Sequence, residues 1–542
     1  YYELNQRANR LASHLRKQGI GPEVCVAVSL ERDIDLVTTI LSILKTGGTY
    51  LPLDFSLPEK RLNFMIKDSG AHHLITQNFS SKKISTSAGK HIDLQSIDLS
   101  NAPECNLKSE INSHHKALAY TIYTSGSTGQ PKGVGLTYKN LSSLLCSDKL
   151  KILDVTKNTR SIWVSSLLFD ASIWELFAAL SSGGTLVIPQ NSQNLVADEL
   201  LDSLKKEQIS YLPIPASLLS SIPLDFSNQI KTAVVFGDVP NRSALEKWSG
   251  KSKIFNGYGP TENTIASTLF LCTSPLSSPL PIGTPISNSN IYVLDEALHP
   301  TPMGIIGEIY IAGDGLARGY INQPALTAEK FIANPFATKE NAKQLQNLRL
   351  YKTGDLGKYN PDGNIVFCNR VDHQVKIRGY RVELREIEHK ISSSHLVQNS
   401  VVLVDKTAKN NKLVAYIELT AEALKNLEFP SSSSSILSGS KIDQLKDVFS
   451  SDLKNSLPSY MIPSIFVFLE NFPLTSNGKI NRKALSIPNT STPSSESAYA
   501  SPCNGTEKKL CLIWQEVLGL EKIGVHDNFF ALGGDSISSI QI

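Results

Sequence analysis

Apolar residues recur at helical spacing at the start of the chain. Leu4, Ala8, Leu11 and Leu15 would lie on one face of a helix that ends at Gly19. The pattern then predicts a buried strand over 24–30, a second helix over 34–44, and further strands over 234–236 and 291–294. Alternation of helix and strand through most of the chain predicts an α/β fold with layered sheets and much parallel pairing.

The pattern changes near residue 370. A densely charged segment, 369–388, precedes a smaller region that we expect to fold as an α+β unit, with a disordered Ser-rich loop over 430–440. The Ser/Pro-rich stretch 488–502 has linker composition, and helical periodicity returns over 507–520. We therefore predict four parts: 1–370, 371–487, the linker 488–502, and 503–542.

Both ends are expected to be cut from a longer protein, because the chain does not start with Met and stops soon after the motif GGDS (533–536). A hydrophobic content of 41% and a charged content of 19% are ordinary for a soluble enzyme. The net charge of +3 has no long runs, so neither nucleic acid nor a membrane surface is indicated as a partner. No apolar run could span a membrane and no signal peptide is present, which predicts a cytoplasmic location.

A candidate phosphate-binding loop occupies residues 117–133, ALAYTIYTSGSTGQPKG. The first seven residues predict a strand, and the Gly and hydroxyl residues after it can surround an anion, with Lys132 adding positive charge. A flexible linker is the alternative, although the preceding strand and Pro131 argue against it. The residues expected to surround the anion here, which the family resemblance described next identifies as ATP, are Thr124, Ser125, Gly126, Ser127, Thr128, Gly129 and Lys132.

The loop segment YTSGSTGQPKG resembles the phosphate loop of adenylate-forming enzymes, which include acyl-CoA ligases, luciferases and the amino-acid adenylation domains of nonribosomal peptide synthetases. Other segments match the adenylation domains in the family's order: LKTGGTYLPLD (44–54), FDAS (169–172), NGYGPTE (256–262), GEIYIAGDGLARGY (307–320), YKTGDL (351–356), LPSYMIP (457–463) and NGKINRKAL (477–485). The resemblance implies a large α/β subdomain (1–370), a small mobile α+β subdomain (371–487) and a partial helical carrier domain (503–542).

The resemblance also implies a nucleotide site for ATP and Mg²⁺. Tyr258 offers an aromatic face for adenine, Asn256 can bond the adenine edge, and the Glu262 carboxylate is a hard oxygen ligand for Mg²⁺. By resemblance, Asp355 binds the ribose hydroxyls and Arg370 contacts the nucleotide. Taken alone, either of these two residues would be a solvated surface charge.

Asp170 separates the amino-acid branch from the acyl-CoA ligases, because its carboxylate can pair with a substrate ammonium. By resemblance, Lys479 sits at the substrate carboxylate, so the small subdomain would close for the reaction, with Asp372 at the hinge. Catalytic roles are expected for Lys479, Lys132 and Glu262. The family's substrate-pocket positions map onto Asp170, Ala171, Trp174, Leu212, Val234, Phe236, Gly257, Ile265, Ala266 and Lys479.

The segment DNFFALGGDSI (527–537) resembles carrier domains, and Ser536 matches the serine that bears phosphopantetheine. This implies a phosphopantetheinyl transferase, a condensation domain and, because Asp535 precedes the serine, an epimerisation domain as partners. Asn369, Arg385 and Asp238 depart from the family's usual residues.

The predicted function is ATP-dependent activation of an amino acid, with a branched aliphatic side chain, as aminoacyl-AMP and its transfer to phosphopantetheine as a thioester. An acyl-CoA or aryl-acid ligase and a non-catalytic module remain as alternatives.

Overall fold

The structure is a computed structural model. It describes residues 1–77, 89–107, 115–126, 129–189, 197–344, 347–372, 374–377, 380–405, 412–426, 436–437, 440–474, 480–485, 500–518, 520, 522–527 and 529. The chain divides into two compact units: a first unit of Tyr1–Thr124, Pro131–Leu195 and Glu199–Asp372, and a second unit of Ser125–Gln130, Val196–Asp198 and His373–Ile542.

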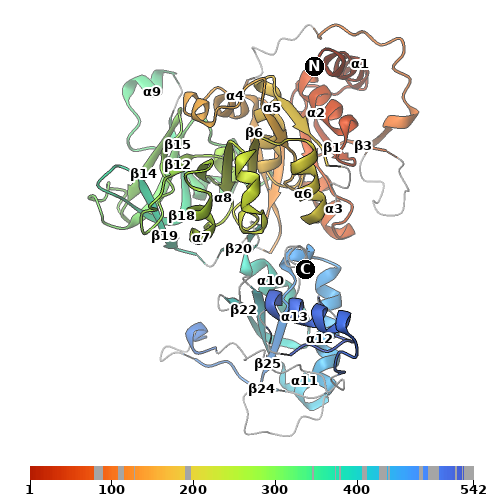
Figure 1. Cartoon of the computed structure of the whole chain (residues 1–542), viewed down its shortest axis with the longest axis vertical. Coiled ribbons are helices and arrows are strands. Elements are labelled where there is room, and N and C mark those ends of the chain that lie inside the picture. The colour runs from red at the N-terminus through yellow and green to blue at the C-terminus, as the bar shows by residue number, and fades with distance from the viewer. Residues whose placement is uncertain are drawn as a thin grey trace. The chain divides into compact units, whose positions relative to one another are not determined.

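The first seven-stranded sheet of the first unit includes β5 and β6, the two strands on either side of the phosphate loop; β1, β3 and β6 of this sheet are labelled in Figure 1. Its order is β16-β6-β5-β2-β1-β3-β4; the neighbours from β5 to β4 are parallel, and β6 pairs antiparallel with both β5 and β16. The strands are β1 (Cys25–Ser29), β2 (Thr49–Pro52), β3 (His73–Thr76), β4 (Lys90–Asp93), β5 (Leu118–Thr124), β6 (Lys132–Thr137) and β16 (Gly319–Tyr320).

The second seven-stranded sheet has the order β13-β12-β11-β10-β9-β7-β8. From β11 to β8 its neighbours are parallel, while β12 pairs antiparallel with β11 and β13. Its strands are β7 (Arg160–Ile162), β8 (Thr185–Val187), β9 (Tyr211–Pro215), β10 (Thr232–Phe236), β11 (Lys253–Tyr258), β12 (Thr268–Cys272) and β13 (Thr284–Pro285).

An antiparallel third sheet completes the first unit, with the order β14-β15-β18-β17 and β19 beside β18. These strands are β14 (Ser289–Leu294), β15 (Gly307–Gly313), β17 (Phe331–Ala333), β18 (Arg349–Tyr359) and β19 (Ile365–Arg370). The helices of this unit are α1 (Tyr2–Lys17), α2 (Ile34–Thr46), α3 (Glu59–Ser69), α4 (Tyr138–Leu145), α5 (Ala171–Ser181), α6 (Ala197–Lys206), α7 (Arg242–Trp248), α8 (Pro324–Lys330) and α9 (Lys339–Gln344).

Local sequence explains where these elements begin and end. The Asp33 carboxylate accepts bonds from the backbone N–H groups of Asp35 and Leu36, at 2.9 and 3.0 Å, and so starts α2. Gly47 ends that helix in the left-handed conformation, at φ +86°. The expected helices at 4–15 and 34–44 are α1 and α2, and the expected strands at 24–30, 234–236 and 291–294 lie in β1, β10 and β14.

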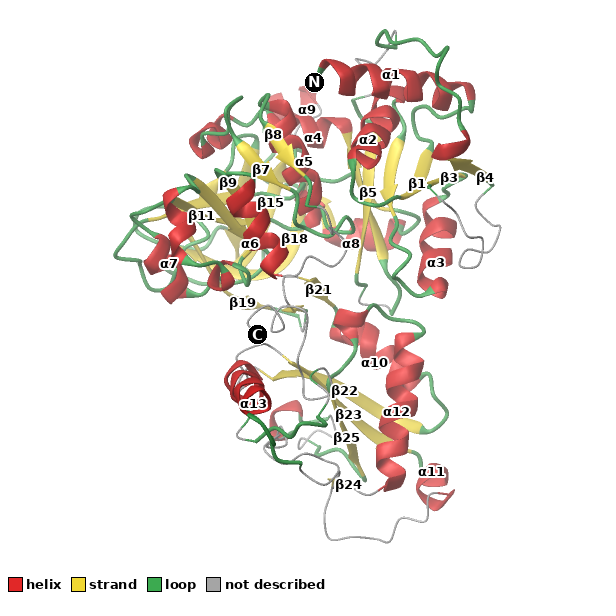
Figure 2. Cartoon of the chain, turned by 45° about the vertical axis from the view of Figure 1, so that its right-hand side comes forward, coloured by secondary structure: helices red, strands yellow, loops and turns green. Residues whose placement is uncertain are grey.

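The second unit has a four-stranded sheet, β22-β23-β25-β24, and a separate β20-β21 pair. Helix α12 packs on the sheet in one apolar cluster with α10 (Figure 2). Its elements are β20 (Val375–Ile377), β21 (Tyr380–Val382), α10 (Leu384–Ser392), β22 (Val397–Asp405), β23 (Lys412–Leu419), α11 (Ala421–Asn426), β24 (Ile436–Leu437), α12 (Ser440–Lys454), β25 (Ile465–Leu469) and α13 (Gly505–Leu518).

The prediction of disorder over 430–440 was wrong at two residues, because Ile436 and Leu437 pair with β25 as a short edge strand. Leu437 is buried there, so its apolar side chain gives this part of the Ser-rich segment a place in the sheet. Helix α13 corresponds to the helical pattern expected over 507–520, and most of the expected linker lies outside the described residues.

Candidate functional site

The phosphate loop joins two antiparallel strands, β5 and β6, whose register pairs Thr124 with Lys132. The Thr124 hydroxyl is buried and has no hydrogen-bond partner among the residues that the structure describes. A buried hydroxyl without a partner costs free energy, so this orphaned donor fits a site for a phosphate oxygen. Gly129 has a φ of +82°, a conformation that favours glycine. Ser127 and Thr128 lie outside the described residues.

Lys132, Glu262 and Tyr320 form a buried charged cluster. The Lys132 Nζ lies 3.5 Å from the Glu262 Oε1, and the Tyr320 hydroxyl donates to the same oxygen at 2.7 Å. The ammonium also lies 3.4 Å from the Tyr320 hydroxyl and 4.6 Å from the centre of its ring. Sheet pairing explains the convergence, because β16 places Tyr320 opposite Val134 of β6.

This cluster fits a Mg²⁺ site that is shared with phosphate. Among the described residues, no group of three or more His, Cys, Asp or Glu side chains could hold a metal on its own. Mg²⁺ is commonly held by one or two carboxylates together with substrate phosphates. Glu262, fully buried beside Lys132, can supply such a carboxylate. Tyr320 was missed by the sequence reasoning, although it is the last residue of the matching segment 307–320.

The predicted ribose residue, Asp355, is the centre of a second network. The Tyr258 hydroxyl donates to its Oδ2 at 2.5 Å, and the Arg370 guanidinium donates to its Oδ1. Burial, and then the negative charge of Asp355, raise the pKa of Tyr258 well above its usual value, so the phenol stays neutral and remains a donor. A carboxylate has about four acceptor positions, so Asp355 keeps capacity for ribose hydroxyls.

Arg370 is committed to protein partners in this structure. Its Nε and Nη2 donate to the two carboxylate oxygens of Asp372, at 2.7 and 2.8 Å, and Nη2 also donates to the Thr353 carbonyl at 3.1 Å. This two-point geometry is the strong form of an Arg–carboxylate pair. Arg370 therefore orients Asp355, and the nucleotide contact expected of it would require its bonds to rearrange.

Asn256, expected at the adenine edge, donates its side-chain amide to the Pro281 carbonyl at 2.9 Å and is buried. Its amide donor therefore supports the protein in this structure.

The expected substrate pocket comes together around one apolar cluster. Trp174 of α5 packs in this cluster with the pocket residues from the second sheet and the loop after it: Val234, Phe236, Ile265 and Ala266. Gly257 faces the same space, because a Cβ added to it would meet the Val234 side chain at 3.4 Å. We call this set the pocket cluster.

Leu212 does not belong to the pocket cluster. It packs with Ile214 in a different apolar cluster, whereas Tyr211 packs with Trp174. Side chains alternate between the two faces of a strand, and the register pairs Pro213 with Val234. The pocket wall from β9 is therefore formed by Tyr211 and Pro213, and the mapping of Leu212 into the pocket was wrong by one residue.

Tyr211 also fixes the orientation of Trp174 in the pocket cluster. The Trp174 indole Nε1 donates to the Tyr211 hydroxyl at 2.9 Å, and both side chains are buried. A buried indole N–H needs a partner, so this bond sets the ring orientation. Ala171 precedes Trp174 by three residues and lies on the same face of α5.

Asp170 immediately precedes α5, and its side chain makes no cap bond to the helix. Tyr120 of β5 is close enough for the Asp170 charge to raise its pKa, although burial is the larger cause. Tyr120 is 1% exposed, and its hydroxyl has no hydrogen-bond partner within the described parts of the chain. Asp170 and Tyr120 thus place polar groups near the start of α5, whereas the pocket cluster is apolar.

The loop after β11 is held in a strained backbone conformation. Thr264 and Ile265 have φ values of +51° and +70°, rare for a β-branched residue such as Ile265. The Thr264 hydroxyl donates to the Gly315 carbonyl at 2.5 Å, which anchors the turn. A Cβ on Gly259 would meet the Ile265 carbonyl oxygen at 2.3 Å, so only glycine fits there. Strain of this kind is typical of ligand-binding loops.

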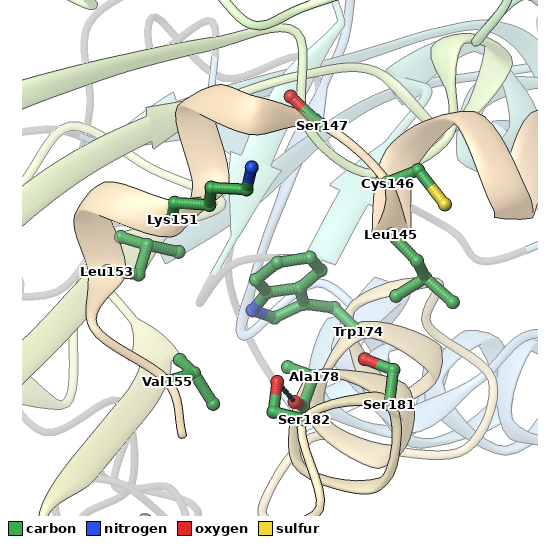
Figure 3. A pocket seen from close by; sticks show the side chains of 10 residues that line it. All are labelled: Leu145, Cys146, Ser147, Lys151, Leu153, Val155, Trp174, Ala178, Ser181 and Ser182. Atoms are coloured by element: carbon green, nitrogen blue, oxygen red, sulfur yellow. Dashed lines mark hydrogen bonds between the residues drawn. The ribbon is translucent and has the colours of Figure 1, made fainter.

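A cavity of about 160 Å³ lies beside Trp174 (Figure 3). It shares only Trp174 with the expected pocket positions, and the other lining residues come from the ends of α4 and α5 and the segment between α4 and β7: Leu145, Cys146, Ser147, Lys151, Leu153, Val155, Ala178, Ser181 and Ser182. Of these lining residues, Leu145, Leu153, Val155 and Ala178 pack in the same apolar cluster as Trp174, so the cavity adjoins the pocket cluster.

Lys479 and Ser536 lie outside the described residues. Asp372 is the last residue of the first unit, and the second unit resumes at His373. No helix among the described residues is long and apolar enough to cross a membrane.

Comparison with protein families gives two matches. The AMP-binding enzyme family matches residues 1–321, and the phosphopantetheine attachment site matches residues 508–542. The second match includes Ser536, whereas the first covers Lys132, Asp170, Glu262 and Tyr320.

Among similar proteins, bacitracin synthase 3 of Bacillus licheniformis is 38% identical over 546 residues, which is all of this chain and 8% of that protein. Gramicidin S synthase 1 of Brevibacillus brevis is 38% identical over 551 residues, 100% of this chain and 47% of that protein. The chain therefore spans less than half of the length of either relative.

Solved structures with similar folds include two multidomain proteins. NpsA-ThdA, an artificially fused adenylation-PCP di-domain NRPS from Klebsiella oxytoca, is 27% identical with a TM-score of 0.72, covering 86% of this chain and 87% of that one. AB3403, a four-domain nonribosomal peptide synthetase bound to AMP and glycine, is 31% identical with a TM-score of 0.60, covering 99% of this chain and 38% of that one. The chain belongs to the AMP-binding enzyme family of adenylate-forming ligases and carries a phosphopantetheine attachment site, the pairing found in nonribosomal peptide synthetases.

Proposed function

We propose that this chain activates an amino acid with a branched aliphatic side chain as aminoacyl-AMP and passes it to its own carrier segment. The observation that carries the proposal is a carboxylate, Asp170, at the start of the helix whose Trp174 lines an apolar pocket. A carboxylate there supplies the counter-charge for an α-ammonium, and the pocket cluster takes the side chain. Fatty and aryl acids have no ammonium, which favours the amino-acid reaction over the acyl-CoA and aryl-acid ligases.

The first half-reaction joins the amino-acid carboxylate to the α-phosphorus of ATP and breaks the bond to pyrophosphate. Lys132, together with Lys479 as the family resemblance implies, would stabilise the negative charge that builds up on the phosphate oxygens. Asp355 would accept bonds from the ribose hydroxyls and hold the α-phosphate in place. Glu262 would hold Mg²⁺ together with phosphate oxygens, and the ion would supply further charge neutralisation.

The second half-reaction transfers the aminoacyl group from AMP to a thiol. That thiol belongs to phosphopantetheine, which would be attached to Ser536 and supplies the nucleophile when present. A phosphopantetheinyl transferase would install the group, and condensation and epimerisation domains are the proposed partners in a longer protein. The much greater lengths of the relatives support such partners.

The test is amino-acid-dependent exchange of pyrophosphate into ATP, run with all twenty amino acids and, separately, with fatty and aryl acids. Exchange with amino acids alone supports the proposal. Exchange with fatty or aryl acids alone would instead identify an acyl or aryl ligase, and the absence of exchange with every acid would identify a non-catalytic module. Aminoacyl loading of the phosphopantetheinylated protein, with Ser536→Ala as the unloadable control, tests the second half.

Leu, Val or Ile is expected to give the highest exchange rate, with Phe lower. The pocket cluster is apolar, and burying a charged side chain there without a partner would cost several kcal/mol. Discrimination among the aliphatic residues should be weak, since one methylene is worth about 1–3 kcal/mol, roughly 10- to 200-fold. Comparing kcat/KM across the twenty amino acids measures this, and a preference for Asp, Glu, Lys or Arg would contradict the pocket assignment.

Tyr320→Phe is expected to weaken binding of Mg²⁺·ATP by about tenfold. The substitution keeps the ring beside Lys132 and removes only the hydroxyl that donates to Glu262 at 2.7 Å. A hydrogen bond to a charged group contributes about 1.5–3 kcal/mol, and about 1.4 kcal/mol is tenfold.

Calorimetric titration of Mg²⁺·ATP, without amino acid, measures this effect directly. Tyr310→Phe is the matched control, because its hydroxyl also donates to a glutamate, Glu308, but at 3.3 Å on β15. Equal affinities of the Tyr320→Phe and wild-type proteins for Mg²⁺·ATP would show that Tyr320 does not orient Glu262.

A further inference from the structure

Two buried ionisable side chains, which contact the segment before Asp170, have no part in the proposed reaction. Glu175 of α5 is 0% exposed, and Arg32, which follows β1, is 8% exposed. Burying a charged group is costly unless it is paired and hydrogen-bonded. Their presence therefore calls for a role that an apolar pair could not fill.

Both side chains bind the same three-residue segment, 163–165, which follows β7. The Glu175 carboxylate accepts from the backbone N–H groups of Val164 and Ser165, at 2.7 and 2.9 Å, and from the Ser165 hydroxyl at 2.5 Å. The Arg32 guanidinium donates to the carbonyls of Trp163 and Ser165, at 2.7 and 2.6 Å.

The two charges therefore satisfy opposite backbone groups of one segment, the acid taking N–H donors and the base taking carbonyl acceptors. Each side chain also affects the pKa of the other. Burial raises the pKa of Glu175 to about 7, while the hydrogen bonds and the Arg32 charge lower it. Burial lowers the pKa of Arg32, while the Glu175 charge raises it. Arg32 lies 5.4 Å from the centre of the Trp163 ring, which packs the guanidinium in place. We call Arg32, Glu175 and residues 163–165 the clamp.

The clamped segment leads directly to Asp170. A short turn, in which the Phe169 N–H donates to the Ser166 carbonyl at 3.0 Å, connects the two. The Asp170 carbonyl then accepts the first helical bonds of α5, from Ile173 and Trp174. Because Glu175 lies on α5 itself, its carboxylate ties the first part of that helix back to Ser165. The turn that carries Asp170 is thus held before it by the clamped segment and after it by α5.

We infer that Arg32 and Glu175 are positioning residues that hold the Asp170 carboxylate where it meets the substrate ammonium. The inference deepens the proposed function and rests on it. It assigns to the clamp an effect on amino-acid binding that is separate from ATP binding, because the contacts that join Lys132, Glu262 and Tyr320 to one another involve no clamp residue.

The experiment compares the wild-type protein with Glu175→Gln and Arg32→Lys, measuring KM for the amino acid and KM for ATP in pyrophosphate exchange. Each substitution keeps the size of its side chain nearly unchanged but weakens the clamp. We expect the amino-acid KM to rise at least about tenfold, since a misplacement of about 1 Å can cost roughly 100-fold. The ATP KM should change less than about twofold.

A second readout is specific to Asp170. The wild-type protein should favour leucine over 4-methylpentanoic acid, which lacks the ammonium, and both clamp variants should lose much of this preference. Arg349→Lys is the matched control, because the Arg349 guanidinium also donates to two backbone carbonyls, those of Ala317 and Arg318, both at 2.8 Å. Its amino-acid KM should stay within about twofold of wild type.

Amino-acid and ATP KM values that rise together, or an unchanged preference for the ammonium in folded variants, would overturn the inference. If Glu175→Gln does not fold, Ser165→Ala is measured instead. This variant removes only the bond from the Ser165 hydroxyl to Glu175. Absence of amino-acid-dependent exchange in the wild-type protein would overturn the proposed function itself, so the two failures are distinguishable.

Discussion

Asp170→Asn is expected to lower kcat/KM for the amino acid by roughly 30- to several-thousand-fold. The substitution preserves the shape of the side chain and removes the counter-charge of the substrate ammonium. Loss of one partner of a desolvated, hydrogen-bonded charge pair costs about 2–5 kcal/mol, and about 1.4 kcal/mol is a factor of ten. The measurement is amino-acid-dependent pyrophosphate exchange at saturating ATP.

A substrate without the ammonium serves as the control. 4-Methylpentanoic acid has the leucine side chain and carboxylate, so its exchange, slow in the wild-type protein, should fall little in Asp170→Asn. The ATP KM should also stay close to wild type, because the contacts that join Lys132, Glu262 and Tyr320 to one another do not include Asp170. An equal loss with both acids would mean that Asp170 does not contact the ammonium.

The order of elements was readable from the sequence because apolar periodicity and caps agree locally. Helix α2 begins at residue 34, as its pattern predicts, and ends at Thr46, two residues beyond the expected end. Strands β1 and β5 follow from short runs of β-branched or aromatic residues. The loop between β5 and β6 was likewise predictable, since its glycines and hydroxyls exclude a continuing strand.

It was harder to predict which side chains of a strand face the pocket than to predict the strand itself. In YLPIP (211–215), apolar residues and prolines occupy every position, so no alternation with polar residues tells which side chains face the pocket. The structure settles this through pairing, with Pro213 opposite Val234, and Leu212 is left on the other face. An error of one residue in such a strand moves the side chain to the opposite layer.

Contacts between residues far apart in the sequence could not be predicted. Arg32 and Glu175 lie far apart in the chain, and nothing in the sequence around either residue indicates that they bind the same segment. Only the packing of the segment after β7 between them reveals the clamp. Tyr320 is a similar case, because its role depends on β16 pairing with β6 and bringing its hydroxyl to Glu262.

On the ATP side of the site, the proposed reaction depends on Glu262. Glu262→Gln is expected to lower kcat for pyrophosphate exchange by roughly 100- to 1000-fold, the size of effect found when one stabilising group is removed from a reacting centre. The amide keeps the shape and can still accept from Tyr320, but it has no charge for Mg²⁺, and it leaves Lys132 without the carboxylate 3.5 Å away.

The Mg²⁺ concentration that gives half-maximal exchange should also rise in Glu262→Gln, whereas the amino-acid KM should change little. Asp314→Asn is the matched control: it breaks a lysine–carboxylate pair of the same unit, Lys139–Asp314 at 2.7 Å, that is partly exposed. Such pairs contribute about 0–1 kcal/mol, so the control should retain near-normal exchange. A Glu262→Gln protein with a wild-type kcat and Mg²⁺ requirement would place the metal elsewhere and leave Glu262 only the role of a buried partner for Lys132 and Tyr320.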